Sequence, residues 1–466
     1  MLVDDRRCVV VGAGVAGLVA ARALRAAGVA VTILESSGRI GGRACTAEIP
    51  DCGTVELGAT WLHGTRGNAA LELAQLLGLV DSSARRRPPE PEDDTFGAPP
   101  KDKSKPARWL REDGVATDHS AVRAVRSTFR DALEAVESSE DGEDDAADAN
   151  VGEKLRRARA RLVGDETPPD AALVDAVWRW STDLQCAIDG CGDLDEQGLH
   201  AYRNYEELGG SHLPGSRLVG GFSGLAATLA VEGSPPLRES IRLGTRVVGV
   251  AWSDDSVTLE CAGGERLHAP ACVLAVPLPA LRTMRFEPPL PVRNAEGLSK
   301  LELGAVEKIF VPFSAADDGT PPPTLNFLWT RGAGGAGAQW PRALHSLSRG
   351  SEGTHLTGWL TGDAARAVSG RPSSELLPEL LEGLEPFQLP WRPLAVHATS
   401  WTTSPHSSGA WSFPRVGAPK DVAQALAAPL GRLSIAGEAT SPQFFGTLHG
   451  AVESGQRAAA EVLGSS

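Results

Sequence analysis

A glycine-rich turn near the start of the chain, placed between an apolar run and a helical pattern, sets the strongest limit on the fold. Residues 8–11 are apolar, as in a buried parallel strand, and they lead without a loop into the turn 12–17, GAGVAG. An Ala- and Leu-rich helix is expected at 16–27 and a second strand at 29–34. Strand, turn, helix and strand in this order predict a doubly wound α/β sheet that binds a dinucleotide.

The glycines of this turn have separate physical roles. Gly12 permits the sharp turn, Gly14 lets a pyrophosphate approach bare backbone, and Gly17 lets the helix lie close to the strand. The exposed amide groups of the turn, Ala16 among them, and the positive end of the helix dipole are expected to hold the phosphates. Glu35 lies about 20 residues further on, at the end of the second strand, and is placed to accept hydrogen bonds from a ribose.

The segment after the second strand favours FAD over NAD. Residues 39–43, RIGGR, put Gly42 and Arg43 just beyond the acid, where the guanidinium is placed for a paired contact with pyrophosphate oxygens. Together with ELGATWLHG at 56–64, this segment resembles the flavin amine oxidase family, which includes monoamine oxidases, polyamine oxidases and flavin-dependent histone demethylases. The resemblance implies further FAD contacts by Gly58, Ala59, Thr60, Trp61, Val247, Gly437, Glu438, Thr447 and Leu448.

The resemblance also implies the fold class, which is α/β: an FAD-binding Rossmann-like domain with a discontinuous α+β substrate-binding domain. A chain of 466 residues is long enough for two such domains. The FAD-binding domain is expected to comprise residues 1–80, 215–290 and 425–466. The substrate-binding domain is expected to comprise 81–214 and 291–424.

Hydrophobic periodicity and the positions of Gly and Pro predict the other elements. Helices are expected at 68–77, 121–136, 153–162, 170–180, 373–384 and 449–463, the last with its N-terminus pointing at the flavin. Strands are expected at 305–313, 324–329, 354–360, 394–401 and 433–436, and a meander at 241–250, 256–261 and 266–276. A Pro-rich linker is expected at 84–106 and a solvated acidic loop at 137–148.

Net charge and cysteine content restrict the classes of binding partner and the cellular compartment that the sequence favours. The formal net charge of −14 repels nucleic acid and anionic membranes and attracts a polycation. The seven cysteines lack paired metal spacing and are interpreted as reduced, which argues against a disulfide framework and a zinc site. No targeting segment or membrane span is recognised at either end, so a cytoplasmic protein is expected. The oligomeric state stays open and is compatible with a monomer.

Lys308 lies in the middle of an expected strand, GAVEKIFVPF. Strand alternation puts Val306 and Phe310 on its face and Glu307 on the other, and both faces are partly apolar, so the pattern leaves its direction open. Exposed lysines are common in strands. The resemblance implies instead that Lys308 is the family lysine that holds a water against flavin N5. There it would assist reoxidation by dioxygen or position water for imine hydrolysis.

His63, in the WLHG segment, has two interpretations. A histidine beside Trp61 is commonly a residue whose hydrogen bonds are satisfied locally. The resemblance to polyamine oxidases implies that His63 faces the substrate amine, where a neutral imidazole would accept a hydrogen bond from the ammonium or help keep the reacting nitrogen deprotonated. Deprotonation is required because a free alkylamine has a pKa of about 10. Trp61 would belong to the same substrate subsite.

Two further residues are expected to form walls of the substrate site. Trp411, in GAWS, matches the family position of an aromatic wall, and Thr447, in FFGTLHGA, stands where monoamine oxidases and plant polyamine oxidases have a tyrosine. Animal spermine oxidase and acetylpolyamine oxidase share this threonine. Trp411 and Trp401 are equally compatible with a role as core tryptophans. Ala410 replaces the cysteine that attaches the flavin in monoamine oxidases, so FAD is expected to be non-covalent.

These residues and the resemblance predict an FAD-dependent polyamine oxidase of the spermine or acetylpolyamine type. Its substrate would be a small polycationic amine, oxidised at the carbon next to a secondary amine by hydride transfer to the flavin. Hydrolysis of the imine would give an aminoaldehyde and a shorter amine, and dioxygen would take the electrons as hydrogen peroxide. The polyamine and the cleaved C–N bond stay open.

Three alternatives accompany this prediction. A flavin-dependent methyl-lysine demethylase is less well supported, since no extra N-terminal helical domain and no long paired-helix insertion are recognised. An amino-acid oxidase is disfavoured because Thr60 and Trp61 stand where that subfamily places a carboxylate-binding arginine. The alternative of another class is a non-catalytic flavin-binding interaction protein. Lys308 and His63 speak against it, while the divergent region 81–200 leaves it open.

Overall fold

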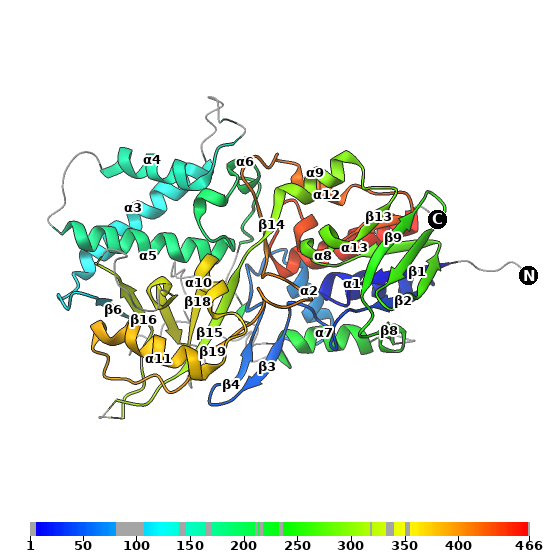
Figure 1. Cartoon of the computed structure of the whole chain (residues 1–466). Coiled ribbons are helices and arrows are strands. Elements are labelled where there is room, and N and C mark those ends of the chain that lie inside the picture. Colours follow the sequence, from blue (N-terminus) through cyan, green and yellow to red (C-terminus); the bar gives the residue numbers. More distant parts are fainter. Residues whose placement is uncertain are drawn as a thin grey trace, which may run out of the picture.

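The computed structural model describes residues 6–80, 107–138, 146, 148–163, 170–209, 213–214, 218–232, 236–316, 319–331, 340–349 and 355–464. Its two largest β-sheets lie at opposite ends of the molecule in Figure 1, and the chain passes between them several times. The expected linker at 84–106 and most of the acidic run after residue 138 lie outside the described residues.

The sheet on the right of Figure 1 is parallel throughout, with the strand order β21-β12-β1-β2-β8. Three separate parts of the chain supply its strands, which are β1 (Arg7–Val11), β2 (Ala30–Leu34), β8 (Ile241–Arg242), β12 (Ala271–Leu274) and β21 (Leu433–Ile435). The central strand is apolar and buried over Cys8, Val9, Val10 and Val11, as a sheet covered on both faces requires. This arrangement confirms the predicted Rossmann-like α/β class.

Helices cover this sheet, namely α1 (Val15–Ala26), α2 (Ala69–Leu76), α7 (Gly221–Val231) and α13 (Leu448–Gly464). The predicted bounds of α1, α2 and α13 are correct to within one residue. α1 and α13 pack closely, because a Cβ on Gly455 would lie 2.4 Å from the carbonyl oxygen of Ala16. Asn68 caps α2, its side chain accepting hydrogen bonds of 3.0 Å from the amides of Ala70 and Leu71.

The predicted meander is partly wrong. A separate sheet has the order β11-β10-β9-β13, made of β9 (Val247–Trp252), β10 (Val257–Cys261), β11 (Arg266–Ala269) and β13 (Arg285–Glu287). The expected strands at 241–250 and 266–276 each divide, and β8 and β12 join the parallel sheet instead. Gly244, with φ +65°, turns the chain after β8, and Pro270, which has no N–H, separates β11 from β12.

The sheet on the left of Figure 1 has the order β19-β15-β18-β17-β16-β6. Its strands are β6 (Arg108–Arg111), β15 (Val306–Pro312), β16 (Leu325–Leu328), β17 (Ser346–Arg349), β18 (His355–Thr361) and β19 (His397–Ala398). Sequence patterns predicted β15, β16 and β18, and missed β6 and β17. Of the strand expected at 394–401 only β19 forms, and residues 394–396 before it are irregular. Beyond Ala398 the chain turns, and its amides bind a buried carboxylate.

Long helices extend this part of the molecule at the upper left of Figure 1: α3 (His119–Ser138), α4 (Val151–Val163) and α5 (Ala171–Asp189). The helix expected at 170–180 continues to Asp189 and ends at Gly190, which has φ +82°. The remaining helices are α6 (Leu199–Tyr202), α8 (Leu278–Thr283), α9 (Val292–Lys300), α10 (Gly362–Val368), α11 (Ser373–Leu384) and α12 (Val422–Ala427). Short strands are β3 (Thr46–Ile49), β4 (Gly53–Glu56), β5 (Trp61–Leu62), β7 (Leu213–Pro214), β14 (Leu301–Leu303) and β20 (Ser412–Pro414).

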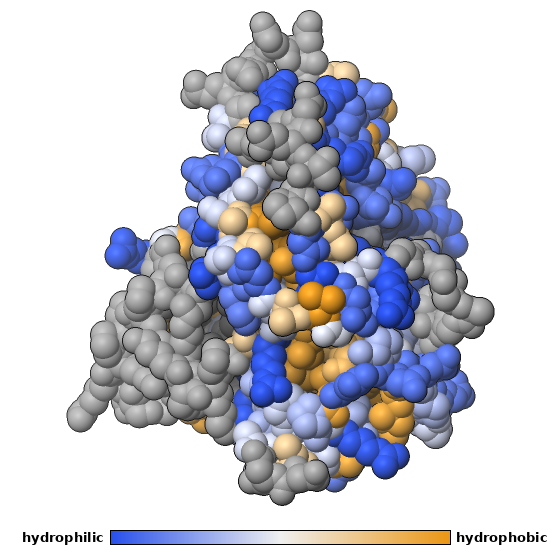
Figure 2. Space-filling model, turned by 90° about the vertical axis from the view of Figure 1, so that its left-hand side faces the viewer, coloured by the Kyte–Doolittle hydropathy of each residue, from blue (hydrophilic) through white to orange (hydrophobic). Residues whose placement is uncertain are grey.

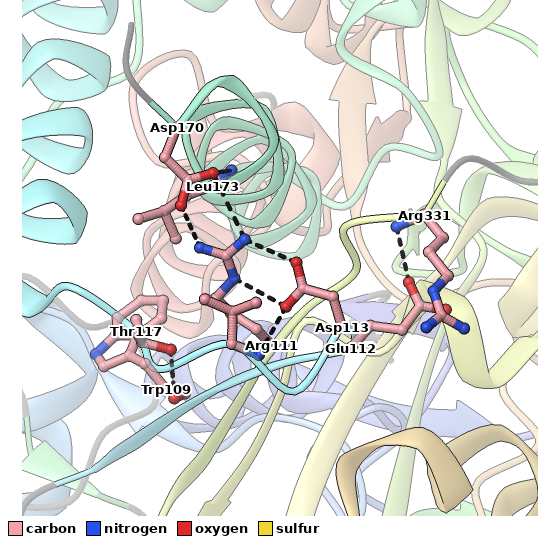
Figure 3. A network of polar contacts seen from close by, with 9 residues as sticks. Trp109, Arg111, Glu112, Asp113, Thr117, Asp170, Leu173 and Arg331 are labelled. Atoms are coloured by element: carbon pink, nitrogen blue, oxygen red, sulfur yellow. Dashed lines mark hydrogen bonds and ion pairs between the residues drawn. The ribbon is translucent and has the colours of Figure 1, made fainter.

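A polar network ties β6 to the start of α5 (Figure 3). The buried guanidinium of Arg111 binds the carboxylate of Asp113 at 2.7 Å and that of Asp170. Asp170 also caps α5 by accepting a 2.9 Å hydrogen bond from the amide of Leu173. Figure 2 shows this end of the molecule as mainly hydrophilic, with a strip of apolar residues down its middle. Within the described parts of the chain, no helix is both long enough and apolar enough to cross a membrane.

Candidate active site

A cavity of about 780 Å³ is lined by residues of both large sheets and their connections. One end reaches the glycine turn after β1, and the other reaches α3, α5 and the segment after α6. Every predicted site residue lines this cavity except Gly17. The fold therefore brings the residues predicted from the sequence together around one cavity.

The three glycines of the turn meet different surroundings. Gly12 has φ +103°, and a Cβ there would lie 2.4 Å from the carbonyl oxygen of Ala275. A Cβ on Gly17 would lie 2.0 Å from the carbonyl oxygen of Gly12, so this glycine allows close packing and lies behind the cavity wall. A Cβ on Gly14 would meet no atom within 4 Å, because Gly14 borders the open cavity. The turn is thus a cradle with room for a ligand against its backbone.

Glu35 fixes the shape of this cradle. Its carboxylate is buried at the end of β2, where Oε2 accepts a 2.8 Å hydrogen bond from the amide of Ala13. The other oxygen, Oε1, accepts a 2.8 Å hydrogen bond from the amide of Ser37. Oε1 also accepts a 3.4 Å hydrogen bond from the hydroxyl of Ser36, whereas Oε2 keeps a further lone pair, so Glu35 has the capacity to accept a ribose hydroxyl as well.

Arg43 crosses from the first part of the chain to the last. Its guanidinium donates 2.7 Å hydrogen bonds to the carbonyl oxygen of Ala410 and to the carboxylate of Glu438. Glu438 in turn accepts hydrogen bonds from the hydroxyl of Ser412 and from the amide of Gly446, the latter at 2.7 Å. This network joins segments that are distant in sequence along one side of the cavity.

The N-terminus of α13 borders the cavity. The hydroxyl of Thr447 donates to the carbonyl oxygen of Phe444 at 2.7 Å and accepts from the amide of Gly450 at 3.0 Å, so Thr447 caps the helix. Leu448 is the first helical residue, and Gly437 leads from β21 into this region. The capping role was not predicted from the sequence. Capping of α13 is thus a structural role for Thr447 at this position.

Lys308 is buried, with 3% of its surface exposed, so the surface interpretation is wrong. Its ammonium donates to the carbonyl oxygen of Glu56 at 2.7 Å, and also to the carbonyl oxygen of Gly58 and the hydroxyl of Thr60. The ring of Trp359 lies over the ammonium, at 4.6 Å from its centroid. Burial lowers the pKa of Lys308 to about 7, while the nearby Glu56 carboxylate acts to raise it.

Tryptophans form the wall beside Lys308. The indole of Trp401 donates to the carbonyl oxygen of Leu57 at 2.9 Å. Trp411 and Trp359 meet edge to face, with centroids 6.1 Å apart and planes at 75°. All three are half-buried and line the cavity. Trp411 and Trp401 are therefore cavity walls, and Trp359 is a third wall that the sequence did not single out.

His63 and Trp61 lie at β5 and just after it, and both line the cavity while half-buried. The backbone carbonyl oxygen of His63 accepts a 2.8 Å hydrogen bond from the side chain of Asn68. Asn68 is fully buried and also caps α2, so it fixes the backbone from which the imidazole projects. Val247, at the start of β9, is buried in the wall near the glycine turn.

A buried carboxylate that the sequence did not reveal lies behind Lys308. Glu307 is completely buried and accepts hydrogen bonds of 2.7 Å from the amide of Thr402 and 3.0 Å from the amide of Trp401. The hydroxyls of Ser369 and Thr399 also donate to it. Glu307 thus holds the turn that carries Trp401.

The far end of the cavity is acidic and open to solvent, since Glu134, Glu137 and Glu207 are exposed there, and we call it the acidic chamber. It is lined by Glu134, Glu137, Asp189, Tyr202, Arg203, Tyr205 and Glu207. Desolvation raises the pKa of Asp189 to about 7 and also raises the pKa of Glu137. The solvated loop expected from residue 137 is wrong at its start, because Glu137 and Ser138 are the last residues of α3 and line the cavity. The other residues of this end were not predicted, since their local patterns carry no sign of a site.

Comparisons with known proteins agree with this geometry. The model of the family described as flavin containing amine oxidoreductase matches residues 15–463. Polyamine oxidase 1 of Oryza sativa subsp. japonica is 28% identical, over 99% of this chain and 98% of its own length. Polyamine oxidase 2 of Arabidopsis thaliana is 28% identical, over 97% of this chain and 86% of its own length.

Other similar proteins are named for different activities. Lysine-specific histone demethylase 1 homolog 3 of Oryza sativa subsp. indica is 29% identical over 97% of this chain, which spans only 53% of that protein. Among solved structures, cyclohexylamine oxidase from Brevibacterium oxydans IH-35A has a TM-score of 0.72 at 21% identity, with 98% of both chains covered. A putrescine oxidase variant has a TM-score of 0.64 at 19% identity, covering 98% of this chain and 99% of its own. These structures share the fold.

Proposed function

This chain belongs to the family of flavin-containing amine oxidoreductases, and we propose that within this family it is a polyamine oxidase acting on a secondary amine of spermine, spermidine or their acetylated forms. The observation that carries the proposal is the position of Lys308. Its buried ammonium lies in the same cavity as the glycine turn at one end and the acidic chamber at the other. Full-length similarity to plant polyamine oxidases supports the same substrate class.

The cavity residues fit FAD. The open side of Gly14 leaves backbone free for a pyrophosphate, Glu35 has capacity for a ribose hydroxyl, and Arg43 borders the same space. We assign the other predicted contacts, at Gly12, Ala16, Gly42, Gly58, Ala59, Thr60, Trp61, Val247, Gly437, Glu438, Thr447 and Leu448, to the same cofactor, whereas Gly17, behind the cavity wall, supports the turn by close packing. When bound, FAD supplies the redox chemistry, taking a hydride from the amine and giving the electrons to dioxygen.

The protein's first task is to orient and desolvate the amine. Trp411 and Trp61 would hold the carbon chain between apolar surfaces, with Thr447 at the opposite wall. Taking the ammonium out of water lowers its pKa, which releases the nitrogen lone pair needed for hydride loss. The imidazole of His63 would accept the hydrogen bond of that nitrogen and receive its proton.

Lys308 would act in the steps that follow amine oxidation, which are reoxidation by dioxygen and hydrolysis of the imine. Its ammonium is fixed by three protein oxygens and by the ring of Trp359, so its position is set before any substrate arrives. A pKa of about 7 makes Nζ able to hold or release a proton near neutral pH. We propose that it positions a water and supplies charge or a proton during reoxidation and imine hydrolysis.

We also propose where the domains divide and where the protein works. The parallel sheet takes strands from the beginning, middle and end of the chain, which supports an FAD-binding domain of 1–80, 215–290 and 425–466. The left-hand sheet supports a substrate-binding domain of 81–214 and 291–424. All seven cysteines are free and buried, which supports a reducing compartment such as the cytoplasm.

Demethylation of methyl-lysine remains a second candidate, favoured by the demethylase relatives. One experiment separates it from the first. The purified flavoprotein is mixed anaerobically with spermine, acetylspermine, a monoamine or a methyl-lysine peptide, and the visible flavin absorbance is followed. Bleaching by a polyamine is expected, with hydrogen peroxide released when dioxygen is admitted. Bleaching by the peptide alone would favour the demethylase, and no bleaching by any amine would overturn both in favour of a non-catalytic protein.

A further inference from the structure

We propose that the hydroxyl of Thr60 passes a proton between the ammonium of Lys308 and the cavity, which makes Thr60 a positioning residue for this lysine. The inference rests on the proposed amine oxidase function and deepens it, because that function does not say how a buried lysine exchanges its proton. Thr60 lies between β4 and β5, where it is half-buried and lines the cavity.

The segment that carries Thr60 has a fixed backbone. The amide of Ala59 donates a 3.0 Å hydrogen bond to the carbonyl oxygen of Arg43. A Cβ on Gly58 would lie 1.7 Å from the same oxygen, so the close approach of the two chain segments requires glycine. The carbonyl oxygens of Glu56 and Gly58, which bind the ammonium, are therefore held in place by the backbone.

The three N–H groups of the Lys308 ammonium all have protein partners. They donate to the carbonyl oxygens of Glu56 and Gly58 and to the hydroxyl of Thr60. A carbonyl oxygen only accepts hydrogen bonds, whereas a hydroxyl also donates. Of these three partners, Thr60 is therefore the one that can receive a proton from Nζ and pass another on. Its own hydroxyl proton is held loosely, in a 3.2 Å contact with the carbonyl oxygen of Gly58.

The remaining surroundings of the ammonium offer no other proton carrier. The ring of Trp359 covers it at 4.6 Å. The carboxylate of Glu56 accepts hydrogen bonds of 2.9 Å from the hydroxyl of Thr46 and 3.1 Å from the amide of Phe222, so it is directed toward α7. Within the described chain, Thr60 thus stands between Nζ and the cavity.

Few charges act on Lys308 from the elements around it. Glu56, at the end of β4, and Cys45, just before β3, act to raise its pKa, and burial raises the pKa of the Cys45 thiol. Glu307 is on the opposite face of β15. β18 presents Trp359, and the residue after β19, Thr399, binds the Lys308 backbone; neither carries a charge. The protonation of Lys308 therefore depends mainly on burial and on its three hydrogen bonds.

These contacts allow Lys308 to exist in two protonation states. A neutral amine has two N–H donors and one lone pair, so the two carbonyl oxygens keep their hydrogen bonds and the Thr60 hydroxyl turns to donate to Nζ. Because burial lowers the pKa of Lys308 to about 7, both states are accessible near neutral pH. The hydroxyl of Thr60 reverses its direction between them.

The proton step follows from this reversal. The hydride lost by the amine carries two electrons and one proton, so dioxygen needs one more proton to become hydrogen peroxide. An N–H bond of Nζ breaks as an O–H bond forms on Oγ1 of Thr60, and the original hydroxyl proton moves to the oxygen that has taken the electrons. Lys308 is left neutral and Thr60 unchanged, and a proton from water later restores the ammonium.

The test compares Thr60→Val, which removes the hydroxyl, with Thr60→Ser, which keeps it. Each flavoprotein is bleached anaerobically with polyamine and mixed with dioxygen over a range of pH. In the wild type, reoxidation should slow as pH rises past the Lys308 pKa of about 7, because less ammonium is present. Thr60→Val should be slower by about 10- to 100-fold and lose this pH dependence, whereas Thr60→Ser should keep both the rate and the profile.

Thr65→Val is the matched control, since Thr65 is exposed and does not line the cavity, and it should behave as the wild type. If Thr60→Val does not hold FAD, Thr60→Ala lacks the same hydroxyl without added bulk and should give the same result. A second measurement uses the apoprotein: the rise in stability with pH that Lys308 produces should begin about 1 pH unit lower in Thr60→Val, because a hydrogen bond to the charged form is lost.

Three results would overturn the inference: a hydroxyl-free variant that reoxidises with the rate and pH profile of the wild type, a serine variant as slow as the valine variant, or an unchanged onset in the apoprotein. If Lys308→Met is slow while Thr60→Val is not, the role of Lys308 stands and the relay through Thr60 is wrong. No bleaching by any amine, before dioxygen is admitted, would defeat the proposed function itself.

Discussion

Glu307 and Lys308 are adjacent on β15, yet both are buried and their side chains leave opposite faces of the strand. Lys308 points into the cavity and binds oxygens of the 56–60 segment. Glu307 binds the turn after β19, including the amide of Trp401. The hydroxyl of Thr399 joins the two residues, since it donates to Glu307 and accepts from the amide of Lys308. Strand β15 thus positions both the Lys308 ammonium and the turn that carries Trp401, a wall of the same cavity.

Replacing Glu307 by Gln should therefore shift the turn that carries Trp401, although Glu307 itself does not line the cavity. The carboxylate accepts hydrogen bonds from two hydroxyls and two amides, and Gln would present an NH₂ group to some of these donors. We expect a loss of about 1–3 kcal/mol in the free energy of unfolding. Because Trp401 would shift, a changed visible flavin spectrum should accompany it. Glu296→Gln, on the exposed surface of α9, serves as the control, and an unchanged spectrum in E307Q would contradict this role.

Two glycine substitutions distinguish cofactor binding from packing. Gly14→Ala places a methyl group in open cavity space, so the apoprotein should keep its unfolding temperature while the purified protein carries less flavin. Gly17→Ala drives a Cβ toward the carbonyl oxygen of Gly12 and should cost about 1–3 kcal/mol of stability. The flavin-to-protein absorbance ratio and thermal unfolding of the apoproteins measure the two effects. Full flavin content in G14A would rule out the assigned pyrophosphate position.

The flavin should be released by acid. Ala410 lies in the cavity wall, where its methyl group has no nucleophile for attachment, and none of the seven cysteines lines the cavity. Precipitation of the protein with acid should leave the yellow colour in the supernatant. A yellow pellet that survives washing would show a covalent link and refute this prediction.

Burial of Lys308 predicts a pH dependence of stability. Its pKa falls from 10.5 to about 7 in the folded protein, so between these values the unfolded chain binds a proton that the folded chain lacks. Stability must then rise with pH across this window, by up to about 1.4 kcal/mol per pH unit, and become independent of this lysine below pH 7. Urea unfolding of the wild type and Lys308→Met across the window isolates the effect. Parallel curves for the two proteins would contradict the lowered pKa.

Local patterns predicted the parts of the fold that depend on neighbours in sequence. The glycine turn, β1, β2 and α13 follow from short motifs, and the resemblance brought Lys308 and His63 into the site. The direction of Lys308 was not predictable, because both faces of β15 are buried.

What the sequence did not reveal depends on tertiary packing. Glu137 was expected in a solvated acidic loop and Asp189 beyond the helix predicted at 170–180, but α3 and α5 extend to include them and bring them to one cavity. Trp359 gains its place from the pairing of β18 with β15, opposite Lys308. The shortening of β19 depends on Glu307, which draws the amides of Trp401 and Thr402 away from strand pairing.

The most direct test of the site is the rate at which dioxygen reoxidises the amine-reduced flavin in Lys308→Met. The variant should retain FAD and still bleach with polyamine, while reoxidation slows by about 10²- to 10⁴-fold, because a positioned proton donor near the flavin is lost. Lys420→Met, at an exposed lysine, should reoxidise at the wild-type rate. A Lys308→Met protein that reoxidises as fast as the wild type would contradict the assignment of Lys308.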